Sequence, residues 1–175
     1  DTLDDGGSRR GCDRERLRRC CLSLSISETF MWKELELLLP ELHRGSCFAM
    51  VGVIWIIQLV HYPAFLWVDR QRFKDFSRFH ADSITPVVLP LMVAELGSAC
   101  GLLLRSADPL HSVGLINVTS IILIWLWTFL VSVPCHEKLA AGGWEEKTIR
   151  WLIHSNWLRT VLWTGRGAVL LCSSS

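Results

Sequence analysis

Three long stretches almost free of charged side chains constrain the fold of this chain more than any other feature. Residues 45–68 contain no Asp, Glu, Lys or Arg, residues 83–104 contain only Glu95, and residues 109–135 contain none. A hydrocarbon core about 30 Å thick is crossed by about 20 helical residues, because each residue adds about 1.5 Å. Each stretch is therefore long and apolar enough to span a membrane, which argues against a soluble helical protein.

A fourth stretch, residues 149–172, is also long enough to cross a bilayer, although it carries His154, Arg159 and Arg166. With this stretch included, we predict an all-α integral membrane domain over residues 47–172, folded as a four-helix bundle with up-down-up-down connections. The four predicted spans cover residues 47–67, 84–104, 111–134 and 151–172, to within a few residues.

The residues before this domain have a different character. Residues 1–30 mix arginine with acidic residues, glycine and serine, and they lack the apolar core of a signal peptide. We expect them to be a disordered tail or an extension foreign to the native protein. Residues 31–46 are expected to form a short amphipathic helix, stopped by Pro40, and a linker.

The basic residues of the short connections predict an orientation. Most of them lie in residues 69–83 and 136–150. Because cytoplasmic loops are enriched in Lys and Arg, we expect both connections to be cytoplasmic and both termini to lie on the opposite face. Phe73, Phe76 and Phe79 recur every three residues between basic ones, a pattern typical of a helix that lies among lipid headgroups. The net charge of +1 argues against a nucleic-acid partner.

Four of the six histidines are predicted to reach the same end of the bundle, one from each helix. These residues, all near the ends of predicted spans, are His61, His80, His136 and His154. Imidazole is the commonest metal ligand in proteins, and helical bundles build cofactor sites from facing helices. One hypothesis is therefore a haem or a transition metal held by two or more of these histidines. The alternative is that histidine suits a membrane interface and bonds backbone carbonyls.

Three charged residues are predicted to lie within the membrane, namely Glu95, Arg159 and Arg166. Isolated charges are costly there, so they should face the interior of the bundle and find partners. On the fourth helix Asn156, Arg159, Trp163 and Arg166 share one face. One interpretation is a Glu95–arginine pair that joins two helices. The other is a catalytic group in which the arginines bind an anionic or quinone-like oxygen and Glu95 transfers a proton.

Two short motifs resemble one another. VHYP at residues 60–63 and VPCH at residues 133–136 each place a proline and a histidine near the end of an odd-numbered span. The repetition is either chance or the trace of two related helical hairpins. Pro63 is expected to loosen the last turns of the first helix, which frees backbone carbonyls near the interface.

Four blocks of sequence, VHYPAF, FHADSITPVVLPLMVAEL, VPCHEKL and SNWLRTVLWTGR, resemble a set of small multi-pass membrane proteins related to anthrone-oxygenase-like families. The resemblance covers residues 47–172 and excludes residues 1–46. It implies four spans and suggests oxygenase chemistry by analogy, but it carries no catalytic residue over to this chain.

Two classes of function follow from these features. The first is a membrane-embedded redox or oxygenase-type enzyme that acts on a lipophilic small molecule, with histidines that hold a cofactor or shuttle protons. The second is a non-enzymatic subunit, assembly factor or small transporter component, whose polar residues serve packing and contacts in a homo-oligomer. In both classes the lipid bilayer surrounds the helices.

Overall fold

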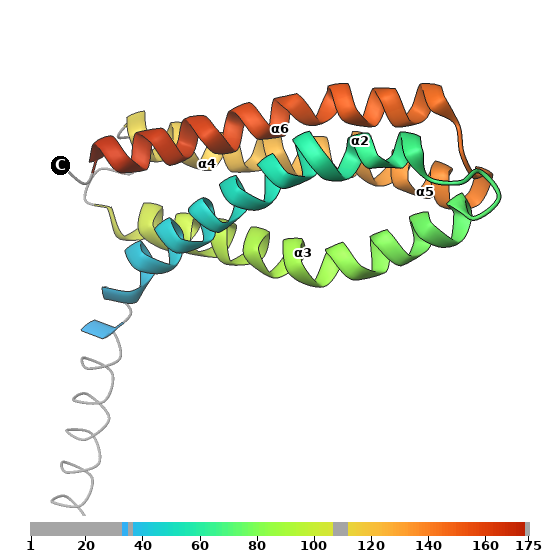
Figure 1. Ribbon diagram of the computed structural model, residues 1–175. Helices are drawn as coiled ribbons and strands as arrows, with labels where there is room; N and C mark the ends of the chain where they lie inside the picture. The colour runs from blue at the N-terminus through green and yellow to red at the C-terminus, as the bar shows by residue number, and fades with distance from the viewer. Residues whose placement is uncertain (1–32, 35–36, 107–111, 174–175) are drawn as a thin grey trace, which may run out of the picture. The chain divides into compact units, whose positions relative to one another are not determined.

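The computed structural model describes residues 33–34, 37–106 and 112–173 (Figure 1). These residues are helical apart from short turns, and no strand occurs among them. The expected tail, residues 1–30, lies outside the described residues. The chain divides into two units, residues 1–38 and residues 39–175, and the helices that pack together belong to the second.

The first helical run ends in three short segments of different helix type. Residues 37–56 are α-helical, and the run continues through the π-helix η1 (Ile57–His61), α2 (Tyr62–Ala64) and the 3-10 helix η2 (Phe65–Trp67). The expected stop at Pro40 is wrong, because the helix passes through this residue.

The second run, α3, extends from Phe73 to Arg105. The phenylalanine-rich connection is therefore its first turns and not a separate helix among the headgroups. Phe73 is fully buried, and its ring centroid lies 5.9 Å from that of Phe65. Pro86 and Pro90 lie inside α3.

The third run combines α4 (Ser112–Trp127), the π-helix η3 (Thr128–Ser132) and α5 (Val133–Gly142). A turn leads into the fourth run, α6 (Glu146–Ser173). Gly143 in this turn has φ 89° and ψ −158°, a conformation that glycine alone adopts readily.

The four runs pack side by side (Figure 1). Helix α3 contacts α4 and α5, and α6 contacts α4, α5 and the end of the first run. One apolar cluster surrounds Phe65 and Leu139, and a second surrounds Ile54 and Trp163. Large apolar side chains cover much of the outer surface as well, which suits contact with lipid.

Three helices within the described residues are long and apolar enough to cross a membrane: Leu37–Trp67, Phe73–Arg105 and Gly114–Gly142. Helix α6 has sufficient length but is not one of them, because polar and charged residues along it lower its hydropathy. The length and apolarity of the three helices are those of an integral membrane protein.

Candidate functional site

Two π-helical turns introduce the polar side chains of the site. Helix η1 ends at His61 and η3 ends at Ser132, and each is followed within two residues by a proline, Pro63 or Pro134. The N–H of Tyr62 bonds the carbonyl of Ile57, five residues back, as a π-turn requires. Each wide turn changes the angular position of the residues that follow it. VHYP thus lies across the end of one π-helical turn, and VPCH begins directly after the other.

His61, His80 and His136 are close neighbours. His61 Nε2 lies 2.6 Å from His80 Nδ1, and the ring centroids of His80 and His136 are 5.1 Å apart. His80 is buried at 4% exposure, whereas His61 and His136 are partly buried. Three of the four histidines expected at one end of the helices therefore lie together.

His154 does not join them, and its assignment to the cluster is wrong. The buried face of α6 carries Asn156 and Arg159, whereas the His154 side chain is exposed. His154 precedes Asn156 by two residues, a rotation of about 200° at 3.6 residues per turn. It therefore points away from the other three histidines, which a count of depth along the helix could not reveal.

The three histidines do not form a metal centre in this arrangement. Two nitrogens that bind one tetrahedral zinc ion at about 2.0–2.1 Å lie about 3.3 Å apart. The 2.6 Å between His61 Nε2 and His80 Nδ1 instead corresponds to a short hydrogen bond. Throughout the described residues, no group of three His, Cys, Asp or Glu side chains is placed to hold a metal ion.

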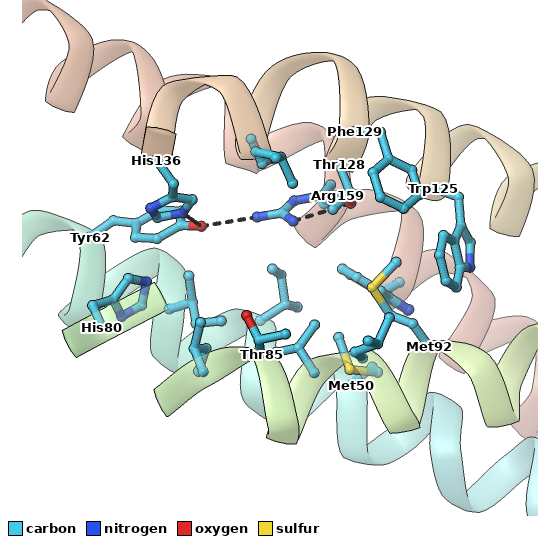
Figure 2. Close-up of a pocket in the computed structure, with 18 residues that line it drawn as sticks. Met50, Tyr62, His80, Thr85, Met92, Trp125, Thr128, Phe129, His136 and Arg159 are labelled. Atoms are coloured by element: carbon cyan, nitrogen blue, oxygen red, sulfur yellow. Dashed lines mark hydrogen bonds between the residues drawn. The ribbon is translucent and has the colours of Figure 1, made fainter. Parts of the chain in front are cut away.

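Tyr62 and Arg159 connect the histidines to α6. Arg159 Nη2 donates a hydrogen bond to Tyr62 Oη over 3.2 Å, and Tyr62 Oη lies 3.1 Å from His136 Nε2 (Figure 2). The tyrosine hydroxyl accepts from the guanidinium, so its own hydrogen is available to His136. Arg159 also donates to Thr128 and Asn156, which fixes the plane of its guanidinium.

The other two charged residues form a separate network. Arg166 Nη1 and Glu95 Oε1 lie 2.5 Å apart, and both side chains are almost fully buried. Trp163 Nε1 donates to the second carboxylate oxygen over 2.9 Å. Arg166 Nε also donates to Asn117, whose amide lies 2.9 Å from His43 Nε2. Glu95, Arg159 and Arg166 therefore do not share one site, and the network around Glu95 joins the first run, α3, α4 and α6.

A cavity of about 250 Å³ lies beside the histidines and between all four runs. Figure 2 shows Tyr62, His136 and Arg159 along one side and Trp125 and Phe129 at the far end. Most of the wall is apolar, and the side chains that line it are Met50, Ile54, Ile57, Tyr62, His80, Ile84, Thr85, Val88, Leu89, Met92, Trp125, Thr128, Phe129, Ser132, Val133, His136, Arg159 and Trp163.

Four buried polar atoms of the cavity's lining residues have no hydrogen-bond partner among the described residues. They are His80 Nε2, Ser132 Oγ, His136 Nδ1 and Trp125 Nε1. An unmade hydrogen bond at a buried polar atom costs about 1–3 kcal/mol, so native proteins rarely leave several in one place. The arrangement is typical of a binding site whose ligand completes these bonds.

The turns beyond the histidines are held by polar contacts. The Arg70 guanidinium lies 4.0 Å from the ring centroid of Trp144, and Lys138 Nζ lies 2.5 Å from Glu145 Oε2. The hydrogen bond from Lys138, with a second from Thr148, lowers the pKa of the Glu145 carboxyl below its ordinary value. The first contact joins the connection before α3 to the one before α6, and the second joins α5 to that same connection.

Sequence reasoning missed Tyr62, Ser132 and Gln58. Gln58 accepts a hydrogen bond from Asn156 over 2.8 Å and donates to the carbonyl of Ile153. Tyr62 left one signal in the sequence, because it is the only tyrosine of the chain and adjoins His61. Ser132 left none.

No protein-family profile matches the chain, and searches of curated proteins and of solved structures found no match to it.

Proposed function

We propose that the protein is a multi-pass membrane protein that binds an oxygen-bearing lipophilic small molecule in the cavity and carries out acid–base chemistry on it. The observation that supports this most is that one apolar cavity is lined by four residues that each carry a buried polar atom without a hydrogen-bond partner among the described residues. Ligand sites combine these same two features, since apolar walls supply affinity and a few polar groups fix orientation.

The size of the cavity limits the ligand. An engineered apolar cavity of about 150 Å³ binds benzene, so about 250 Å³ suits a molecule of one or two fused rings. A porphyrin is far larger, so a haem does not fit the cavity as built. The apolar wall favours a hydrocarbon body, and the polar side favours an oxygen function that accepts and donates hydrogen bonds.

The residues on the polar side have complementary roles in this proposal. Arg159 places its positive charge beside the cavity, where it stabilises a developing oxyanion, and the bond to Tyr62 holds the guanidinium in position. His80 and His136 each have a ring nitrogen without a hydrogen-bond partner in the described part of the chain, and these nitrogens accept or return a proton. The groups together suit proton abstraction from a phenol or from carbon beside a carbonyl. The resemblance to anthrone-oxygenase-like proteins extends the proposal to oxidation of the resulting anion, with molecular oxygen as the oxidant.

The proposal includes the arrangement in the membrane. All four runs cross the bilayer as an up-down-up-down bundle, and α6 does so because Arg159 and Arg166 are buried against its neighbours. Residues 69–83 and 136–150, which include helix ends, lie on the cytoplasmic side, and the termini lie on the opposite face.

A second function, that of a non-enzymatic membrane subunit, is favoured by one observation. Glu95 bonds both Arg166 and Trp163 in a network separate from His61, His80 and His136, as expected of residues that only hold helices together. In a subunit of this kind the cavity would have no specific ligand, so a binding measurement separates the two functions.

Titration of the protein in lipid nanodiscs with 2-naphthol tests the proposal. This fluorescent two-ring phenol should bind saturably and take up excitation energy from Trp125 and Trp163, which line the cavity. The substitution Val88→Phe fills the cavity and should weaken binding at least tenfold. The matched control Val87→Phe alters an exposed neighbour outside the cavity and should leave binding unchanged. Uptake without saturation, equal in all three proteins, would contradict the proposal.

A further inference from the structure

A hydrogen bond joins His61, which is partly exposed, to His80, which lines the cavity. Their facing nitrogens are 2.6 Å apart, so one imidazole donates to the other. His80 is buried and lines the cavity, and its second nitrogen, Nε2, has no hydrogen-bond partner in the part of the chain that the structure describes. His61 is only partly buried. We infer that the two imidazoles relay protons between water and a ligand in the cavity, an inference that rests on the proposed function.

The outer end of this path lies at the polar surface of the membrane. Arg78 and Asp82, the residues two before and two after His80 on α3, are both exposed. A charged side chain that faces hydrocarbon is costly, so this level of α3 lies at the interface with water. His61 is bonded to His80 at the same level, and its Nδ1 is the nitrogen that exchanges protons with interfacial water.

Aromatic rings shield the path on its sides. The Phe65 ring centroid lies 5.6 Å from that of His61 and 5.1 Å from that of His80, and Phe76 packs on Phe65 at 5.2 Å. These apolar rings cover part of the sides of the two imidazoles, which favours proton transfer along the hydrogen bond between them.

The polar groups that face the path from other elements belong to the cavity. His136 on α5 lies 5.1 Å from His80 between ring centroids, and Tyr62 on α2 lies 6.4 Å away. On α6, the charged residue linked to these groups is Arg159, which donates a hydrogen bond to Tyr62. A fixed positive charge beside the cavity favours transfer of a proton from a bound ligand outward, because it stabilises the anion left behind.

Each transfer conserves protons and changes no oxidation state. A ligand O–H or C–H gives its proton to His80 Nε2, while His80 Nδ1–H passes to His61 Nε2 and His61 Nδ1–H passes to water. One proton leaves the ligand and one reaches water. Both imidazoles stay neutral and exchange tautomers, and the reverse sequence returns a proton to the ligand.

Exchange of imidazole protons with water, measured by nitrogen-15 NMR on histidine-labelled protein without ligand, tests the relay. In the unaltered protein the ring proton of His80 should exchange with bulk water at least tenfold faster than that of His136. His61→Gln should slow the exchange at His80 about tenfold or more. His154→Gln, which removes the exposed histidine of α6, should leave it unchanged.

Equal exchange rates at His80 and His136 in the unaltered protein would overturn the relay, and so would an unchanged rate at His80 in H61Q. The comparison within the unaltered protein stands even if H61Q does not fold. Because no ligand is added, failure of the relay is distinct from failure of the proposed function. Failure of the proposed function would appear only as loss of saturable 2-naphthol binding. H61Q should still bind 2-naphthol.

Discussion

The hydroxyl of Tyr62 accepts a hydrogen bond from Arg159 Nη2 across 3.2 Å, which joins the end of the first helical run to the middle of α6. Tyr62 is buried at 3% exposure and Arg159 at 5%. A bond between a buried guanidinium and a phenol is stronger than one between neutral groups, because the donor is charged. It orients the guanidinium along one wall of the cavity and leaves the phenol hydrogen for His136 (Figure 2).

Replacement of Tyr62 by phenylalanine should therefore lower both stability and ligand affinity. The ring would still pack, but Arg159 Nη2 and His136 Nε2 would each lose the hydroxyl as a partner. A buried polar group without its partner costs about 1–3 kcal/mol. Thermal unfolding in detergent should show this loss, and 2-naphthol should bind more weakly. Trp67→Phe, at a largely exposed aromatic of the same run, serves as the control and should alter neither.

The helices were predictable from sequence because hydropathy over about 20 residues is a property of composition. The depth of a residue along its helix was predictable as well, since it needs only a count of residues from the end of the span. His61, His80 and His136 do lie at the same depth. Angular position was not predictable in the same way. The π-helical turns η1 and η3 change the angular position of the side chains around the helix axis, and the size of this change could not be read from the sequence. These turns place Tyr62 and Ser132 in the site.

The partner of Glu95 was undetermined for a related reason. Arg159 and Arg166 lie seven residues apart on one face of α6, so a helix period cannot choose between them. The choice depends on how α3 and α6 are aligned along their lengths, and this alignment follows from side-chain packing around Trp163.

Replacement of Glu95 by glutamine should strongly destabilise the protein. The substitution leaves the buried Arg166 charge without its counter-ion, and loss of one partner from a buried pair costs about 3–5 kcal/mol. Glu146→Gln breaks the exposed pair with Arg150 and should cost less than about 1 kcal/mol. Chemical denaturation in mixed micelles would measure both values.

A double substitution separates a structural from a chemical role for Glu95. Glu95→Leu combined with Arg166→Leu removes both charges, and such apolar replacements of buried pairs are often neutral or stabilising. We expect the double variant to recover most of the stability and to bind 2-naphthol normally. Recovered stability with lost binding would instead assign Glu95 and Arg166 to the ligand site.

Replacement of Gly143 by alanine should destabilise the turn between α5 and α6. Its backbone conformation is unfavourable for any residue with a Cβ, by about 1–3 kcal/mol, and the added atom would meet the Lys74 side chain at 3.3 Å. Gly142→Ala is the matched control, because Gly142 is helical and a Cβ there meets nothing within 4 Å. A lower unfolding temperature for G143A alone is expected, and equal effects of the two substitutions would contradict it.

Replacement of Arg159 by lysine tests whether the site needs a guanidinium or only a positive charge. Arg159 donates at the same time to Tyr62, Thr128 and Asn156, and three nitrogens in a fixed plane make these bonds. A lysine ammonium keeps the charge but presents its donors from a single atom, so it cannot reproduce that geometry. We expect R159K to fold with a loss of about 1–3 kcal/mol in the free energy of unfolding, from the unmade buried hydrogen bonds.

The affinity of R159K for 2-naphthol should fall at least tenfold, because Tyr62 would lose the bond that orients it. Arg150→Lys changes an exposed arginine on the same helix and should alter neither quantity. If R159K bound 2-naphthol as tightly as the unaltered protein, charge alone would suffice and the fixed guanidinium would have no part in recognition.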